Sequence, residues 1–360
     1  MISFGRGVPA PECLAVEELA ECARAALEHD GRTILSYGPG GGYGPLREWL
    51  AERHGVEPGR IIVTSGSLQG FVFVSEQLVR AGTRVLVEAP TYDRPLKILT
   101  RLGAEIVAVP MDDEGLLPDE LPEGDFAFLY TIPTFQNPSG RTLSLERRRR
   151  LAELARERGL LVLEDDPYGL VRYEGEALPS LFELAEGEGV AYASSFSKTV
   201  APGLRVGWFV LPQELAEEIE ALAVSTYISP PYLSQATVLE FARGGNFEPN
   251  LERVNGLLRE RRDAMLDALA RELPDDASWT RPEGGYFVWL DLPSGPPAAE
   301  LLATAEQAGV TFVKGTDFFP GGRGGEQSLR LAFSYVSPDE IAEGVSVLGS
   351  LVRAAAPAAL

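Results

Sequence analysis

The sequence contains little of what disulfide-rich or metal-binding proteins rely on. Only two cysteines, Cys13 and Cys22, and two histidines, His29 and His54, occur in 360 residues. Two cysteines this close together in one helical pattern cannot build a disulfide framework or a zinc ribbon, and a reducing, cytoplasmic location fits best. Both histidines lie in charged helical surroundings. General acid or base chemistry is therefore expected to fall to Lys, Tyr, Asp or Glu.

Basic charge and long apolar runs are also scarce. The chain has 32 Lys and Arg residues against 53 Asp and Glu residues, a formal net charge of −21. Nucleic acid is not expected as a partner, because phosphate binding needs clustered basic side chains. No stretch reaches the roughly 18 apolar residues of a membrane span, and the first residues lack the pattern of a secretory signal. We therefore expect no membrane partner, although arginines inside a cleft can still bind a small anion.

Short apolar segments alternate with longer amphipathic ones through the middle of the chain. Apolar segments with little polar alternation are typical of buried parallel strands, and helical patterns lie between several of them. This rhythm predicts an α/β fold, a mostly parallel sheet flanked by helices, with a smaller α+β domain after it. The predicted strands are 61–64, 84–89, 104–110, 126–131, 160–165, 190–196 and 205–211.

The pattern changes after about residue 245. A long amphipathic helix at about 250–272 is followed by short strands and helices, which indicates a second unit. The N-terminal 36 residues are too short to fold alone and are expected to join that unit. The predicted division is an N-terminal segment 1–36 joining the small domain, a large domain 37–245 and a C-terminal small domain 246–360.

Polar residues stand at the ends of several predicted strands, where open parallel sheets bind ligands. Gly66 and Ser67, in SGSLQG, would present backbone N–H groups at a helix N-terminus, which suits an anion; a simple helix cap is the alternative. Asp165, in LEDDPYG, would be an unfavourable buried charge unless it met a cation, with Tyr168 near the same ligand. Asn137, in IPTFQNPSG, is held out of the helical region by the proline after it. Plain turns would also explain these two segments.

The segment SSFSKTVAPGLRVG places one lysine, Lys198, among hydroxyl groups and near a second cation, Arg205. A lysine amine in such surroundings loses its proton more readily and can attack an aldehyde. Ser195, Ser197 and Arg205 would meanwhile hold an anion. Pyridoxal 5′-phosphate (PLP) would satisfy every group at once. It offers an aldehyde to the lysine, a basic ring nitrogen to the aspartate, an oxygen to the asparagine and tyrosine, and a phosphate to the serines and arginine.

The chain resembles the fold type I PLP-dependent aminotransferases of class I/II. Within them it is similar to the branch of 2-aminoadipate aminotransferases and the aminotransferase domains of MocR-type regulators. The resemblance runs from about Ser3 to the last helix, and its motifs in order are far more specific than any one alone. These motifs are SGSLQG, APTYDRP, NPSG, EDDPYG, SSFSKTVAPGLRVG and SLRLAFSY.

The resemblance implies a role for each matching residue. Lys198 forms a Schiff base with the cofactor and moves the Cα proton, while Asp165 pairs with the pyridine nitrogen. Arg330 of SLRLAFSY clamps the substrate carboxylate, with Asn137 beside it; a surface arginine on an edge strand is the alternative. The cofactor is further held by the backbone of Gly66, Ser67 and Leu68, by Ser195, Ser197 and Arg205 at the phosphate, by Tyr92 on the ring face, and by Tyr168 and Asn137 at the ring oxygen.

The resemblance also implies an assembly and a reaction. Tyr37, in YGPGGGYGPLREWL, matches the tyrosine that reaches the phosphate of the neighbouring subunit. Each site would then need two chains, so a homodimer is implied. The implied reaction moves the amino group of an L-amino acid to a 2-oxo acid such as 2-oxoglutarate.

Several positions depart from the pattern of the branch. Arg6 stands where glycine is usual, and we hypothesise that it reads an anionic group on the substrate; a solvated surface arginine is the alternative. Lys314 occupies a usual proline position, and Leu68 replaces a usual glutamine. A longer arm precedes this point in the 2-aminoadipate enzymes. Without it, the site is expected to be more open and to admit a bulky substrate.

Two other functions would use the same residues. A PLP-dependent lyase, γ-replacement enzyme or cyclase of specialised metabolism would need the same cofactor and the same lysine, so the motifs do not separate it from an aminotransferase. A non-catalytic PLP-sensing regulator is the remoter alternative. Regulators of the MocR type carry a DNA-binding winged helix before this domain, whereas here the motifs begin at residue 3, and the acidic balance opposes DNA binding.

Overall fold

The computed structural model describes residues 1–355 and contains a large domain built on an eight-stranded sheet. The strands of this sheet are β2 (Ile61–Thr64), β3 (Arg84–Ala89), β4 (Glu105–Asp112), β5 (Gly115–Leu116), β6 (Leu129–Thr131), β7 (Val162–Asp165), β8 (Val190–Ser195) and β9 (Gly207–Val210). Their order is β2-β9-β8-β7-β6-β3-β4-β5. The pairs from β4 to β8 are parallel, while β9 runs against both its neighbours and β5 against β4. The predicted mostly parallel sheet is confirmed.

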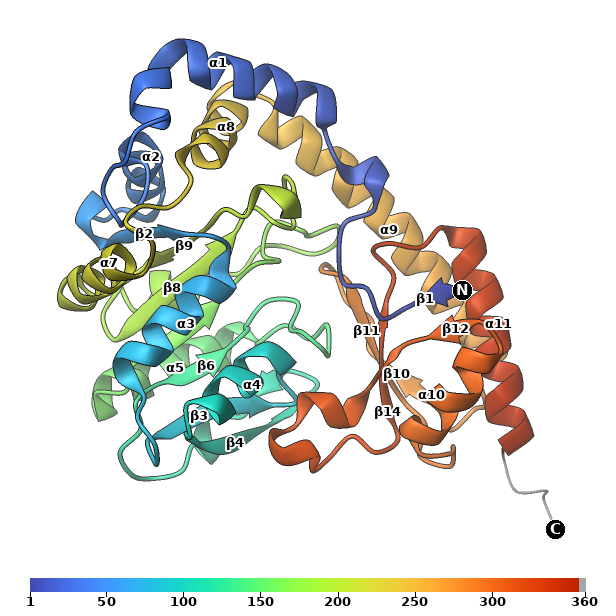
Figure 1. Ribbon diagram of the computed structural model, residues 1–360. Helices are drawn as coiled ribbons and strands as arrows, with labels where there is room; N and C mark the ends of the chain where they lie inside the picture. The colour runs from blue at the N-terminus through green and yellow to red at the C-terminus, as the bar shows by residue number, and fades with distance from the viewer. Residues whose placement is uncertain (356–360) are drawn as a thin grey trace.

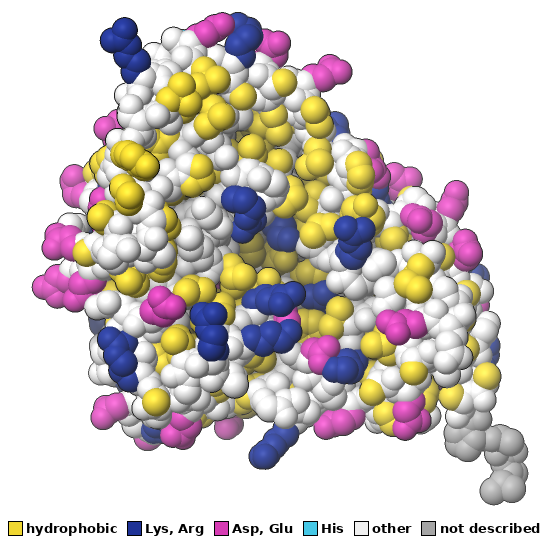
Figure 2. Space-filling view, in the orientation of Figure 1, with side chains coloured by type: hydrophobic (Ala, Val, Ile, Leu, Met, Phe, Trp, Pro, Cys, Tyr) yellow, Lys and Arg dark blue, Asp and Glu magenta, His cyan; other side chains and the backbone are white. Residues whose placement is uncertain are grey.

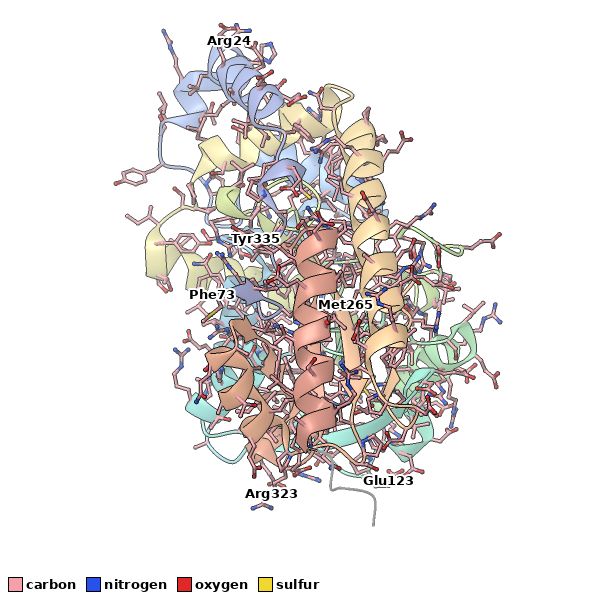
Figure 3. The ribbon with its side chains drawn as sticks, turned by 90° about the vertical axis from the view of Figure 1, so that its right-hand side faces the viewer. Arg24, Phe73, Glu123, Met265, Arg323 and Tyr335 are labelled. Atoms are coloured by element: carbon pink, nitrogen blue, oxygen red, sulfur yellow. The ribbon has the colours of Figure 1, made fainter. Side chains whose placement is uncertain are left out.

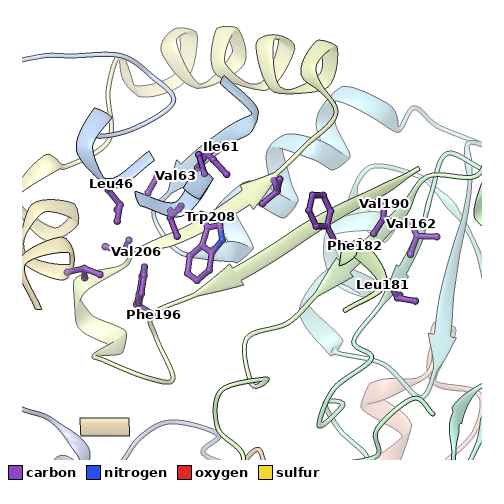
Figure 4. Packing of buried hydrophobic residues seen from close by; sticks show 14 of the residues in the cluster. Leu46, Ile61, Val63, Val162, Leu181, Phe182, Val190, Phe196, Val206 and Trp208 are labelled. Carbon is purple, nitrogen blue, oxygen red and sulfur yellow. The ribbon is translucent and has the colours of Figure 1, made fainter. Parts of the chain in front are cut away.

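Both faces of the sheet are buried under helices (Figure 1). Successive residues of a strand point to opposite faces, so Val162 and Leu163 belong to different apolar clusters. Figure 4 shows one of these clusters, which extends from Leu46 past Trp208 to Val190. Burial of both faces explains the unbroken apolar runs in the sequence. The helices are α2 (Gly44–His54), α3 (Ser67–Leu78), α4 (Asp93–Arg101), α5 (Leu145–Arg158), α6 (Leu181–Leu184), α7 (Gln213–Tyr227) and α8 (Tyr232–Arg243).

A smaller α+β unit follows, as the sequence predicted. Its elements are α9 (Phe247–Glu272), β10 (Ser278–Trp279), β11 (Phe287–Asp291), α10 (Ala298–Gln307), β12 (Val310–Thr311), β13 (Val313–Lys314), β14 (Ser328–Ala332) and α11 (Pro338–Ala355). Four strands form an antiparallel sheet in the order β10-β11-β14-β13. Helix α11 packs beside α9, and Figure 3 labels Met265 of α9 next to this contact.

The N-terminal segment contacts both units. Strand β1 (Ile2–Ser3) pairs in parallel with β12, and Phe4 lies in the core of the small unit. Helix α1 (Val16–Ile34) instead packs on α8, with Cys22 in the core of the large unit. The proposed domain boundaries at residues 36 and 245 stay a prediction. Segments on either side of each boundary pack against each other, as α1 does on α8 and α8 on α9. Short 3₁₀ helices complete the chain: η1 (Pro11–Cys13), η2 (Pro58–Arg60), η3 (Pro118–Glu120), η4 (Pro202–Leu204), η5 (Gly315–Phe318) and η6 (Pro320–Gly322).

Membrane crossing needs a long apolar helix. Among residues 1–355, no helix combines the necessary length with the necessary hydropathy.

Candidate active site

A cavity of about 450 Å³ lies at the carboxyl ends of the parallel strands, between the large and the small unit. Its volume is in the range of pockets that bind small ligands. Figure 2 shows Lys and Arg side chains gathered around the hollow. The lining therefore favours an anionic ligand, although the chain as a whole carries a formal charge of −21. The charged lining residues are Arg6, Arg94, Lys198, Arg205 and Arg330 against Asp93 and Asp165.

The cavity brings together all but two of the predicted site residues. Gly66 lies just behind the wall at φ +82°, and a Cβ there would stand 2.1 Å from Arg205 Nη2, so only glycine fits. Tyr37 is 82% exposed and does not line the cavity of its own chain. The predicted residues that do line it are Arg6, Ser67, Leu68, Tyr92, Asn137, Asp165, Tyr168, Ser195, Ser197, Lys198, Arg205 and Arg330.

Lys198 follows β8 and points its amine into the cavity. Its Nζ atom donates a hydrogen bond of 2.8 Å to the carbonyl oxygen of Gly7. Burial lowers the pKa of Lys198 to about 8, helped by the positive charges of Arg330 and Arg205 and opposed by Asp165. Such an amine is unprotonated in part of the molecules near neutral pH. In that state it can act as a nucleophile or a base.

Asp165, the last residue of β7, faces the cavity with one oxygen unpaired. Its Oδ2 atom accepts a 2.6 Å hydrogen bond from the Tyr130 hydroxyl. Its Oδ1 atom is buried and has no hydrogen-bond partner within residues 1–355. Burial raises the pKa of Asp165 to about 6, although the Tyr130 hydrogen bond works in the opposite direction. A buried carboxylate oxygen without a partner indicates that a ligand supplies the donor.

Arg330 of β14 is a buried cation that forms no ion pair within the described part of the chain. Its Nη1 donates to Asn137 Oδ1 and its Nη2 to the Gly5 carbonyl oxygen, both at 3.0 Å. The rings of Phe287 and Phe318 flank the guanidinium at 4.4 and 4.9 Å. Burial lowers the pKa of Arg330. Because an unpaired buried charge is unfavourable, this position suits the carboxylate of a ligand.

Donors for a phosphate gather at the other end of the cavity. Ser67 begins α3, whose positive N-terminal end faces this region. Arg205 Nη1 lies 3.4 Å from Ser197 Oγ, and Nη2 donates to the Ser65 carbonyl oxygen at 3.0 Å. The backbone N–H of Ser197 donates to Ser195 Oγ at 3.4 Å. A helix terminus, a guanidinium and two hydroxyls are groups that suit a phosphate.

Arg6 lies between two anchored glycines. Gly5 accepts from Arg330 and Gly7 from Lys198, so the segment crosses the cavity between these two cations. The Arg6 guanidinium stacks on the Tyr335 ring, 4.4 Å from its centre, and Tyr335 is labelled in Figure 3. Of the other unusual positions, Leu68 lines the cavity. Lys314 does not, and instead pairs with Asp317.

Sequence analysis missed two buried groups, Tyr130 in the lining of the cavity and Glu88 behind it. Tyr130 holds Asp165, and Glu88 of β3 accepts hydrogen bonds from Thr131 Oγ1, Ile132 N and Gln136 Nε2 at 2.9 to 3.0 Å. Burial raises the pKa of Glu88 to about 7. The available signal was a polar side chain inside an apolar strand, in RVLVEA and FAFLYT.

The residues present fit PLP. The unpaired Asp165 oxygen suits the N–H of a protonated pyridine ring, and the donors near Ser67 and Arg205 suit the phosphate. The Lys198 amine suits the aldehyde, while Arg330 remains for the carboxylate of a substrate.

Fold and site together define a PLP-dependent enzyme of fold type I. A model of the family "Aminotransferase class I and II" matches residues 2–348, and the chain belongs to this family.

Relatives of this chain span nearly its whole length. A 2-aminoadipate transaminase of Thermus thermophilus is 42% identical, over 98% of this chain and 90% of the relative. An aromatic-amino-acid aminotransferase of Thermococcus litoralis is 36% identical, over 98% of this chain and 88% of the relative. The crystal structure of α-aminoadipate aminotransferase LysN from Thermus thermophilus, complexed with N-(5′-phosphopyridoxyl)-L-leucine, matches with a TM-score of 0.93. It is 40% identical, over 98% of this chain and 92% of that chain.

These comparisons confirm the predicted class, activity and cofactor. The protein is a PLP-dependent aminotransferase whose substrates are amino acids and 2-oxo acids. The part that each residue plays, the identity of the amino acid and the assembly remain predictions.

Proposed function

We propose that this aminotransferase takes its amino group from an L-amino acid with an anionic side chain and passes it to a 2-oxo acid such as 2-oxoglutarate. One observation carries the proposal: Arg6 lines the cavity, and the glycine carbonyl oxygens on either side of it accept from Arg330 and Lys198. A substrate with its α-carboxylate on Arg330 and its amino group near Lys198 would extend its side chain toward Arg6. The name of the 2-aminoadipate relative supports the same substrate class, because 2-aminoadipate carries a second carboxylate.

The side chains divide the chemistry between them. PLP, when bound, supplies an aldehyde that bonds amines and a ring that accepts electrons. Lys198, with a pKa lowered to about 8, would take the proton from the substrate Cα as a base and deliver it to C4′ of the cofactor as an acid. Asp165 keeps the ring nitrogen protonated, and Arg330 orients the substrate by its carboxylate.

The remaining residues hold the cofactor. The amide oxygen of Asn137 accepts a hydrogen bond from Arg330, so its amide nitrogen remains to donate to the ring oxygen. Tyr168 is fully buried beside this position and serves the same oxygen, while Tyr92 covers the ring face. The phosphate is bound by the backbone of Gly66, Ser67 and Leu68, by Ser195 and Ser197, and by Arg205.

We also propose that the enzyme is a homodimer in the cytoplasm. Tyr37 is 82% exposed and so is available to a second chain, which is what a residue serving the neighbouring phosphate requires. Cys13 and Cys22 are both buried and form no disulfide, which supports a reducing compartment.

An amino-donor screen tests the substrate class. Purified enzyme loaded with PLP is incubated with 2-oxoglutarate and single amino acids, and the oxo acid products are measured by mass spectrometry. We expect acidic donors such as 2-aminoadipate to be used best. Replacing Arg6 with Gln should lower kcat/KM for acidic donors about tenfold, the effect of one charge-assisted hydrogen bond, and leave leucine nearly unchanged.

Two controls accompany the screen. Arg323→Gln removes an exposed arginine outside the cavity and should change neither donor class. Lys198→Ala should abolish the oxo acid product and the borohydride-trapped cofactor adduct on the peptide that contains residue 198. Equal losses for acidic and apolar donors in Arg6→Gln would contradict the substrate class. A trapped adduct in Lys198→Ala would contradict the role of the lysine.

A further inference from the structure

Tyr130 and Asp165 face each other from neighbouring parallel strands. Tyr130 of β6 pairs in register with Leu163 of β7, two positions before Asp165, and side chains two apart share a face. The Tyr130 hydroxyl donates to Asp165 Oδ2 at 2.6 Å. Tyr130 is only 1% exposed, and its ring packs edge-on against Phe71 at 5.1 Å. The ring is therefore held in place, and its hydroxyl has a fixed direction.

The next residue along the chain, which follows the end of β7, provides a comparison. Asp166 accepts a hydrogen bond from the Tyr192 hydroxyl at 3.1 Å with Oδ2, and from the Gly169 backbone N–H at 2.8 Å with Oδ1. Both of its oxygens are thus paired within the chain. Asp165 also has a tyrosine on Oδ2, but its Oδ1 has no partner within residues 1–355. Of the two tyrosine–aspartate pairs, only the one that lines the cavity keeps an oxygen open.

Several groups act on the ionisation of Asp165. Burial and the negative charge of Asp166 raise the pKa of Asp165, whereas the Tyr130 hydrogen bond and the positive charge of Lys198 lower it. A hydrogen bond that a donor makes to the charged form favours that form. Tyr130 therefore offsets part of the effect of burial. The other titratable groups that sense Asp165 are Glu88, Tyr92 and Tyr168.

We propose that Tyr130 is a positioning residue for the cofactor ring: by donating to Oδ2 it keeps Asp165 ionised and leaves Oδ1 free to meet the ring nitrogen. The proposal rests on the role of Asp165 proposed above. Tyr130 acts through Asp165 and needs no contact with the substrate. Its hydroxyl should therefore affect how tightly PLP binds, and at which pH, without requiring a change in substrate choice.

Binding of PLP to the full-length apoprotein tests this inference. The dissociation constant is measured by fluorescence titration between pH 5 and 9 for wild type, Tyr130→Phe and Tyr192→Phe. Through the protonation of Asp165, the loss of one hydrogen bond to its charged form predicts about tenfold weaker binding for Tyr130→Phe at pH 5 and about twofold weaker binding at pH 7. The acid limb of the binding curve should move up by about one pH unit, because Asp165 then takes up a proton more readily. Tyr192→Phe, which removes the same kind of bond beside the cavity, should match wild type.

A double-variant cycle separates this inference from the proposed function. In an Asp165→Asn background the charge that Tyr130 stabilises is gone, and a further Tyr130→Phe change should alter the dissociation constant at pH 5 less than about twofold. In the double variant position 165 is an asparagine, so the loss of the Tyr130 hydroxyl leaves no buried carboxylate without its partner. The comparison with Asp165→Asn therefore remains possible if Tyr130→Phe alone unfolds. An unshifted acid limb in Tyr130→Phe, or a full tenfold loss in the asparagine background, would overturn the role of Tyr130 alone. If Asp165→Asn itself binds PLP like wild type, the role of Asp165 is wrong.

Discussion

At the scale of single residues, the cavity holds charged groups away from water. Lys198 has a pKa lowered to about 8 by burial, against an ordinary value of 10.5. Because the folded pKa lies below the unfolded one, the unfolded chain binds more protons between pH 8 and 10.5, and stability rises with pH across that window. The buried amine that the chemistry needs therefore destabilises the apoprotein at neutral pH.

Lys198→Met removes this charge and keeps an unbranched side chain of similar length. We expect the free energy of unfolding of the apoprotein to increase by about 2 kcal/mol at pH 7, because the penalty for the buried charge disappears. Most of the gain should vanish near pH 10, where the folded wild type is already uncharged at this position. Urea denaturation at the two pH values measures the difference. A gain of the same size at both, or a loss at pH 7, contradicts the argument.

At the scale of elements, buried carboxylates at the ends of β3 and β7 hold the segments that lie beside them. Glu88 of β3 accepts from Thr131, Ile132 and Gln136, and so ties down the loop that carries Asn137. Glu164 of β7 accepts from the backbone N–H groups of residues 181 and 182, at the start of α6. Burial raises the pKa of both carboxyl groups to about 7. Of the two glutamates, only Glu88 bonds a residue next to one that lines the cavity, because its partner Gln136 precedes Asn137.

Replacing either glutamate with alanine should separate stability from function. Glu88→Ala and Glu164→Ala each leave two or more buried donors unpaired, so each should lower the free energy of unfolding by about 3 kcal/mol. Only Glu88→Ala should also raise KM for the amino donor, because it releases the loop of Asn137. Urea denaturation and steady-state kinetics measure the two effects. Unchanged KM in Glu88→Ala, or equal KM increases in both, contradicts the assigned connection.

The same elements show which parts of the site could be predicted from the sequence. Parallel strands carry ligands at their carboxyl ends, so the polar residues after β2, β6, β7 and β8 were predicted from strand ends, and the structure brings them together. Tyr92, after β3, was predicted only from the family resemblance. Tyr130 and Glu88 were missed because their partners lie on neighbouring strands, and register is not visible in one sequence. The course of residues 5–8 along the cavity was equally hidden, since two hydrogen bonds to glycine carbonyl oxygens fix it.

At the scale of the whole molecule, several large apolar side chains are exposed in one region of the surface. Leu35 and Tyr37 are 76% and 82% exposed in the loop after α1. This loop packs against the end of α7 and the start of α8 through hydrogen bonds from Tyr227 and Tyr232. Ile228, 53% exposed, lies beside it at the end of α7. In the homodimer proposed above, a second copy of the chain would cover these side chains.

Subunit complementation tests whether Tyr37 serves the site of the partner. A chain with Lys198→Ala and a chain with Tyr37→Phe are co-expressed under different tags, and the mixed dimer is purified. If Tyr37 acts across the interface, the intact lysine of the second chain meets the intact tyrosine of the first, and one of the two sites is complete. The mixed dimer should then show about half the activity of wild type and bind PLP at that site with wild-type affinity.

The outcome differs if Tyr37 acts within its own chain. The mixed dimer would then contain one site without lysine and one with phenylalanine, so its activity could not exceed half that of the Tyr37→Phe homodimer. The prediction needs Tyr37→Phe to weaken PLP binding by itself, and the loss of one hydrogen bond to a phosphate should do so about tenfold. Ile228→Asp tests whether the apolar region forms the dimer interface. A charge there should shift the equilibrium from dimer toward monomer, which sedimentation measures. Leu170→Asp, at a side chain 47% exposed elsewhere on the surface, should leave the dimer intact.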